Sequence, residues 1–171
     1  ALIPLTHPLA AVHGANNAVF VEAEAAGPLM FYGAGAGGIQ TASAVLGDVV
    51  SAARRHVAGG PGVAESTHAD LPVLPISAIM TRYQIALLVA DEPGVLAHVA
   101  ALFQSHGVSV ETVQQSVAAV DPLSGAEAPS AATLVIGTHE ASEADLAATV
   151  AALTTSSVVH GVTSVLRVEG L

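Results

Sequence analysis

The pattern of apolar and polar positions separates the chain into two parts. In the first part, residues 1–58, short alternating segments at 17–23 and 29–32 predict two strands joined by a turn. Between residues 39 and 57 the apolar positions recur every three or four residues, which predicts one amphipathic helix. Gly59 follows its last turn, a position where glycine commonly ends a helix. The first part is therefore predicted to contain two strands and one long helix.

The second part is separated from the first by a glycine- and proline-rich stretch, residues 59–80, which is typical of a linker. Residues 81–171 then alternate between the periods of strands and helices. The predicted elements are a strand over 83–89, a helix over 95–103 ended by Gly107, a strand over 108–117, a hairpin loop at 121–125, a strand over 132–138, a helix opened by Ser142 and Asp145 with Leu146, Val150 and Leu153 facing inward, and a strand over 162–168. This βαββαβ order predicts a ferredoxin-like α+β domain, a four-stranded antiparallel sheet with two helices on one face.

Composition and charge exclude several classes of partner. Fourteen acidic side chains stand against four arginines and no lysine, giving a formal net charge of −10. Such a chain cannot neutralise a run of phosphates, so we expect neither a nucleic acid nor an anionic membrane as partner. Cysteine is absent, which excludes disulfides, zinc-thiolate sites and cysteine nucleophiles. The chain begins with Ala1 and without a signal sequence, so we expect a cytoplasmic protein and a start inside a longer polypeptide.

A glycine-rich loop lies between the second predicted strand and the long helix. Residues 33–38 read Gly-Ala-Gly-Ala-Gly-Gly and contain the G-x-G-x-x-G spacing of dinucleotide-binding loops. The second parallel strand and the acidic residue that complete such a site are missing from the region that follows. Two interpretations stay open at equal weight: a backbone contact to a cofactor, and glycines needed for close packing of helix and strand.

Several short motifs lie along both parts of the chain, namely His7-Pro8-Leu9-Ala10, Asn16-Asn17-Ala18-Val19, Gly35-Ala36-Gly37, Thr41-Ala42-Ser43-Ala44-Val45, Asp48, and Asp91-Glu92-Pro93-Gly94-Val95-Leu96. Together they resemble the homoserine dehydrogenase family of actinobacterial type. The first part is similar to the end of its catalytic core, and the second to an ACT domain, the amino acid-binding regulatory module that follows this core in many bacterial members.

The resemblance implies an NAD(P)-dependent oxidoreductase that interconverts L-homoserine and L-aspartate 4-semialdehyde. In the family, the catalytic lysine and the substrate-binding acids come earlier in the chain, so no catalytic residue is expected here and the 171 residues alone are expected to be inactive. NADP or NAD would serve the full-length enzyme, with a contact at Gly33, Gly35 and Ala36 but no tight binding to this segment. Homodimers or higher oligomers would form through the ACT domains and residues 1–32.

The turn at residues 91–94 is the candidate effector site of the ACT-like part. The amides of Gly94, Val95 and Leu96 open a helix, and its positive end favours an anion such as an amino acid carboxylate. Asp91 would pair with the ligand ammonium. The family implies that Ser109 and Val110 of a paired module face this turn, and that threonine is the favoured effector. The alternative is an ordinary solvated turn that starts a helix.

Eight histidines raise the question of a metal site. They lie in separate segments without H-x-x-x-H or H-E-x-x-H spacing, so we expect no metal. His98 and His106 are interpreted as exposed helix residues and His160 as a loop residue, while Tyr83 and Phe103 are expected in the core. A second function stays open beside the dehydrogenase, namely a stand-alone, non-catalytic ACT module that senses amino acids and acts through dimerisation.

Overall fold

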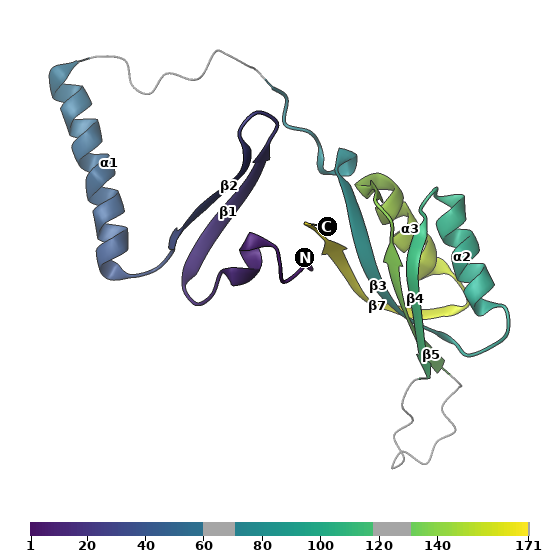
Figure 1. Ribbon diagram of the computed structural model, residues 1–171. Coiled ribbons are helices and arrows are strands. Elements are labelled where there is room, and N and C mark those ends of the chain that lie inside the picture. Colours follow the sequence, from purple (N-terminus) through teal and green to yellow (C-terminus); the bar gives the residue numbers. More distant parts are fainter. Residues whose placement is uncertain (60–70, 118–130, 171) are drawn as a thin grey trace, which may run out of the picture. The chain divides into compact units, whose positions relative to one another are not determined.

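The computed structural model describes residues 1–59, 71–117 and 131–170, and the predicted hairpin loop at 121–125 lies outside them. The chain forms two compact units (Figure 1), one of residues 4–72 and one of residues 1–3 together with 73–171. The second, larger unit is called the ACT unit below. Among the described residues no helix combines the length and apolar character needed to cross a membrane.

The smaller unit contains an antiparallel hairpin and one long helix. Strands β1 (Asn16–Ala23) and β2 (Gly27–Ala34) pair along their whole length, and Gly27 supplies the positive φ of 70° that the turn between them requires. Helix α1 (Gly38–Ala58) follows and ends at Gly59. None of the described residues of this unit is buried, and the apolar stripe of α1 is exposed within it. An exposed stripe of this kind is typical of a surface that packs against another part of a protein.

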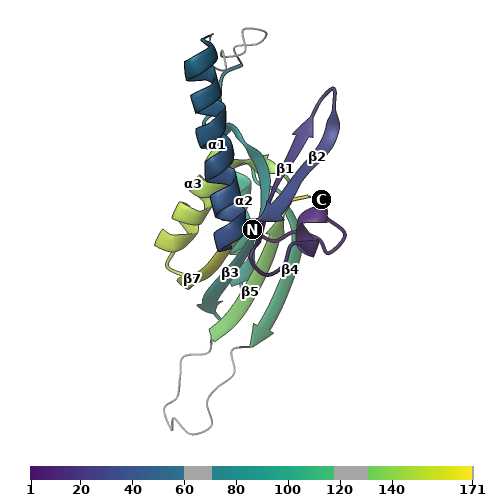
Figure 2. The same cartoon turned by 90° about the vertical axis from the view of Figure 1, so that its left-hand side faces the viewer.

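The ACT unit has the predicted βαββαβ order. Its main strands are β3 (Met80–Ala90), β4 (Val110–Val117), β5 (Ala131–Thr138) and β7 (Val159–Val168), in the spatial order β4-β5-β3-β7 with antiparallel neighbours throughout. A two-residue strand, β6 (Ala141–Ser142), pairs with the start of β3. Helices α2 (Val95–Ser105) and α3 (Glu143–Thr155) contact each other and lie on one side of the sheet (Figures 1 and 2).

The core lies between these two helices and the sheet. Along β3 every second side chain is buried, and the same alternation runs along β5, because successive residues of a strand point to opposite faces. The largest fully buried side chains are Phe103, Ile85, Leu87, Leu134, Ile136, Leu146, Leu153, Val89, Val99, Thr138 and Thr149. The predicted core positions Phe103 and Tyr83 are 1% and 6% exposed, so both predictions are confirmed.

The ends of the helices follow local rules that the sequence displays. The Ser142 hydroxyl accepts a hydrogen bond from the Asp145 amide (3.1 Å) and so caps α3, as its spacing predicted. Gly107, with φ of 70°, ends α2 and turns the chain toward β4. The prediction for His160 was wrong, because this residue lies in β7 rather than in a loop. The register of β3 and β7 shifts there, and a bulge accommodates it.

The first residues of the chain belong to the ACT unit. Leu2 forms a parallel bridge with Val168, its amide donates to the Arg167 carbonyl oxygen (2.7 Å), and its carbonyl oxygen accepts from the Glu169 amide (2.9 Å). Leu2 therefore lies beside the last residue of β7, on the side of this strand away from β3. At the opposite edge, β4 pairs with β5 alone among the described strands.

Candidate functional site

The turn between β3 and α2 has the backbone geometry of an anion site. Gly94 caps α2 with φ of 93°, and no side chain caps the helix at this end. The Val95 amide already donates to the Glu92 carbonyl oxygen (3.4 Å), which leaves the amide of Leu96 as the first in the helix to face outward without an intrahelical partner. The Val95 side chain is 7% exposed and its amide is already engaged, so at the start of α2 the Leu96 amide is the better placed of the two to bind a ligand.

Asp91 lies at the rim of this turn. It is exposed, and the described part of the chain places no hydrogen-bond donor or cation on its carboxylate. Leu96 lies one turn further and keeps 45% of its surface exposed. Residues 91–96 thus combine an exposed carboxylate, the Leu96 amide and a partly exposed apolar side chain.

The second half of the predicted site lies at the opposite end of the same unit. Ser109 and Val110 follow α2 and open β4, whereas Asp91 precedes α2. The eleven residues of α2 span about 16 Å at 1.5 Å per residue. Within one chain the structure therefore does not bring the two predicted halves together.

A hollow of about 430 Å³ accompanies the second half. Phe103 and Gly107 of α2 and its C-terminal turn form one wall, and Val108, Ser109 and Val110 form the other. The Ser109 carbonyl oxygen is occupied by the His139 amide (2.9 Å), which fixes the backbone here and leaves the exposed Ser109 side chain toward solvent. The volume of this hollow lies within the range of small-molecule sites.

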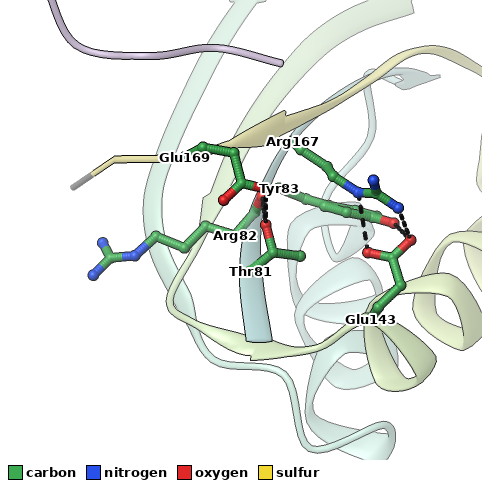
Figure 3. Close-up of polar contacts among 6 residues, drawn as sticks. All are labelled: Thr81, Arg82, Tyr83, Glu143, Arg167 and Glu169. Atoms are coloured by element: carbon green, nitrogen blue, oxygen red, sulfur yellow. Dashed lines mark hydrogen bonds and ion pairs between the residues drawn. The ribbon is translucent and has the colours of Figure 1, made fainter. Parts of the chain in front are cut away.

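The ACT unit holds a buried polar cluster that the sequence analysis did not identify (Figure 3). Glu143, the first residue of α3, accepts two hydrogen bonds from the Arg167 guanidinium (2.7 and 3.3 Å) and one from the Tyr83 hydroxyl (2.7 Å). These bonds from Arg167 and Tyr83 hold the pKa of the Glu143 carboxyl below its usual value of 4.5. Burial, assisted by the negative charge of Glu143, raises the pKa of Tyr83 above 10.0.

Two further contacts occupy the same end of the sheet. The Thr81 hydroxyl donates to Glu169 (2.9 Å), and Arg82 of β3 forms an ion pair with Glu111 of β4 (3.1 Å). With Arg167 bound to Glu143, both arginines of the ACT unit are paired. Since the chain contains no lysine, these two arginines are the permanent side-chain cations of the unit, and each already has a carboxylate partner. The backbone amides of the turn before α2 are a further donor for a ligand carboxylate.

The glycine loop of the smaller unit shows a local reason for two of its glycines. A Cβ atom on Gly35 would collide with the Asn17 side chain, and the Gly35 amide donates to the Ala15 carbonyl oxygen (3.0 Å). Gly37 has φ of 129° and begins α1. Close packing therefore explains Gly35 and Gly37. It does not explain Gly33, which has open space around the position of a Cβ atom.

Of the three predicted cofactor contacts, Gly33 lies in β2 opposite Asn17, while Gly35 and Ala36 lie in the loop that follows β2. A hollow of about 290 Å³ runs beside them, lined by both strands from Asn17 to Val19 and from Phe31 to Gly35. Among the described residues, no group of three or more His, Asp or Glu side chains lies close enough to hold a metal ion.

The larger unit is thus a ferredoxin-like α+β module with an open edge strand and a glycine-capped turn before its first helix. Comparison with known proteins identifies the families that each part of the chain resembles. The ACT domain profile matches residues 83–155, and the homoserine dehydrogenase profile matches residues 1–50. The two profiles cover separate parts of the chain, one in each unit.

Individual relatives extend this match to nearly the whole chain. The homoserine dehydrogenase of Mycobacterium tuberculosis is 55% identical over 99% of this chain, and that of Corynebacterium glutamicum is 49% identical over 98%. The crystal structure of a homoserine dehydrogenase from Thiobacillus denitrificans superposes with a TM-score of 0.77 at 33% identity, covering 98% of this chain and 37% of that one. The chain belongs to the homoserine dehydrogenase family as its C-terminal region with an ACT domain, and it spans 38% of the length of the mycobacterial relative.

Proposed function

We propose that the chain is the regulatory C-terminal part of an NAD(P)-dependent homoserine dehydrogenase, which interconverts L-homoserine and L-aspartate 4-semialdehyde in the biosynthesis of threonine, methionine and isoleucine. The observation that carries this proposal is the 55% identity across 99% of the chain, through both units and in one order. In this proposal the ACT unit binds an amino acid, with threonine favoured, and transmits feedback inhibition to the catalytic part.

The arrangement of the strands supports an effector site shared by two copies. Strand β4 runs parallel to β3, because both are antiparallel to β5, and β4 is an edge strand. If a second copy adds its own β4 in antiparallel fashion, the start of that strand lies at the level where β3 ends. Ser109 and Val110 of the second copy then approach Asp91 and Gly94 of the first. The two halves that lie apart in one chain would form one site in a dimer.

The chemistry of such a site matches an amino acid. The carboxylate would accept hydrogen bonds from the outward amides at the start of α2, including that of Leu96, and the positive end of the helix would add to this attraction. The Asp91 carboxylate would hold the ammonium group. The hollow beside Ser109 and Val110 would receive the side chain.

Calorimetry tests this site directly. L-threonine at millimolar concentration is titrated into the chain and into Asp91→Ala, with Glu92→Ala as the matched control, because Glu92 is a neighbouring exposed carboxylate outside the site. We expect heat from the native chain and from Glu92→Ala, and at least fivefold weaker binding to Asp91→Ala. Isoleucine and methionine are measured alongside. Equal heats in all three proteins, or no heat with any amino acid, would contradict the proposed site.

The oligomeric state is tested by light scattering. The open edge of β4 and the exposed stripe of α1, which includes Leu46 at 61% exposure, both favour self-association. We propose homodimers or higher oligomers formed through the ACT units and residues 1–32. A monodisperse monomer at all concentrations would contradict this.

The cofactor proposal concerns NADP or NAD bound to the complete enzyme. The backbone atoms of Gly33, Gly35 and Ala36 would approach the cofactor. Packing within this chain does not require a glycine at position 33, because a Cβ atom there would meet no neighbour. We propose that the 171 residues alone do not oxidise homoserine, because they contain no lysine to act in catalysis. An assay with homoserine and NADP on this chain checks this, and measurable turnover would refute it.

A stand-alone sensor is the second candidate function. The observation that favours it is the ACT unit itself, which is a compact unit with its own buried core. Amino acid binding and dimerisation without any dehydrogenase activity, when the chain is supplied with a separate catalytic part, would favour the sensor. Restored activity that responds to threonine would favour the dehydrogenase.

A further inference from the structure

The ACT unit is joined to the smaller unit at two places in the sequence, after residue 3 and before residue 73. At the first, Leu2 is held on β7 by two backbone hydrogen bonds, which together form its parallel bridge with Val168. Leu2 keeps 38% of its surface exposed when docked. Two backbone hydrogen bonds on a three-residue segment at the edge of the sheet can open without unfolding the domain.

The second connection between the units, before residue 73, leads into β3 and contacts the same end of the sheet as Leu2. The Ile79 carbonyl oxygen accepts from the Glu143 amide (2.8 Å), just before β3 begins. Glu143 also binds the Arg167 side chain, while the Arg167 carbonyl oxygen accepts from Leu2. Glu169 binds Leu2 through its amide and Thr81 through its carboxylate. Both segments are therefore tied to one end of the sheet by a connected set of hydrogen bonds. Figure 3 shows the side-chain contacts of this set, Thr81 with Glu169 and Glu143 with Arg167.

This end of the sheet also contains the start of β4. Glu111, next to Val110, forms an ion pair with Arg82 across β5 (3.1 Å). Arg82 lies opposite Val168 in the β3–β7 register, and Val168 bridges to Leu2. A displacement at the start of β4 thus reaches residues 1–3 through two strand pairings and one ion pair.

We propose that residues 1–3 form a releasable latch strand on β7, which couples amino acid binding at the ACT unit to the segment that leads into the smaller unit. The inference rests on the proposed effector function. The docked latch holds β7 and Arg82 in the arrangement that positions the start of β4, so the docked state binds the amino acid more tightly. By linkage, the amino acid then favours docking by the same factor.

Hydrogen exchange on the 171-residue chain tests the docking. The Glu169 amide reports the latch, because it donates to the Leu2 carbonyl oxygen. Leu2→Pro removes the amide that binds Arg167, and we expect the Glu169 amide to exchange at least tenfold faster in this variant. Leu5→Pro is the matched control, since Leu5 is 95% exposed and follows Pro4 in a turn where proline is tolerated. Equal exchange in Leu2→Pro and the native chain would overturn the latch.

Threonine, or whichever of threonine, isoleucine and methionine gives heat, tests the coupling. We expect it to slow exchange of the Glu169 amide at least threefold, while amides in the middle of β7 change less. Leu2→Pro should bind the amino acid at least threefold more weakly and Leu5→Pro should not. Binding without these effects would overturn the coupling and leave the effector function intact. No binding of any amino acid would overturn the effector function and the coupling together, while the exchange result in Leu2→Pro would still decide the docking.

Discussion

Replacing Tyr83 by Phe isolates one hydrogen bond of the buried cluster. The ring stays in the core, where Tyr83 is 6% exposed, and only the hydroxyl that donates to Glu143 (2.7 Å) is removed. A hydrogen bond to a charged group contributes roughly 1.5–3 kcal/mol to the free energy of unfolding. Solvent reaches the cluster from the side of Arg167, which retains its own two bonds to Glu143, so the lower end applies. We expect a loss of about 1.5 kcal/mol at pH 7.

The loss should depend on pH with a definite sign. The folded-state pKa of Glu143 lies below its ordinary value of 4.5, so its contribution to stability is complete above that value and disappears as the pH falls through the folded pKa. The folded-state pKa of Tyr83 lies above 10.0, so its contribution is complete below that value and disappears as the pH rises through the folded pKa. Tyr83→Phe should therefore lose the alkaline limb of the stability profile and show a shallower acid limb.

Urea unfolding followed by far-UV circular dichroism measures this loss, and Tyr32→Phe is the control. Tyr32 lies in the smaller unit and is 57% exposed, so its replacement should change stability by less than about 0.5 kcal/mol. The reasoning would be refuted if Tyr83→Phe lost less than about 0.5 kcal/mol at pH 7. A loss that remained constant from pH 7 to about pH 2, where carboxyl groups are protonated, would refute it equally.

Three further substitutions test the packing and the turns. Leu153→Ala removes a fully buried side chain from α3 and should lower the free energy of unfolding by about 2–5 kcal/mol in urea titrations. Gly107→Ala should lower the free energy of unfolding by about 1 kcal/mol, because the φ of 70° disfavours a side chain although a Cβ atom there meets no neighbour. Gly161→Ala is the control: a Cβ atom there also meets no neighbour and φ is not positive, so the loss in the same assay should be smaller. Gly35→Ala should speed exchange of the residue 35 amide by displacing the loop from Asn17, and adding Asn17→Ala should reverse this if packing alone requires the glycine.

Elements with a strong period could be predicted from the sequence. The alternation along residues 83–89 and the three- and four-residue spacing on α1 arise from local geometry, so β3 and α1 were predicted within a few residues. The cap at Ser142 and the stop at Gly107 were predicted for the same reason, since both depend on residues next to one another. The ferredoxin-like fold of the ACT unit followed from the order of these elements.

The polar cluster could not be predicted, because its members meet only after the strands are in register. Tyr83, Glu143 and Arg167 come from β3, α3 and β7, and no motif connects them. The composition carried one signal. Because the chain has four arginines and no lysine, a carboxylate that becomes buried on folding has few permanent cations available as partners, and Arg167 is one of them. The attachment of Leu2 was equally hidden, since it depends on backbone atoms and carries no residue preference. The two halves of the proposed effector site stay a prediction, because they lie apart within one chain.

The pairing of Leu2 with Val168 also bears on how the chain folds. The two residues come from opposite ends of the sequence, so this contact closes the longest loop in the chain. Loop-closure entropy and high contact order make such a contact one of the last to form. The rest of the ACT unit can reach its native core first, since its own contacts are closer in sequence. During synthesis, residues 1–3 leave the ribosome before any strand of this sheet exists, and they dock only when its final strand is complete.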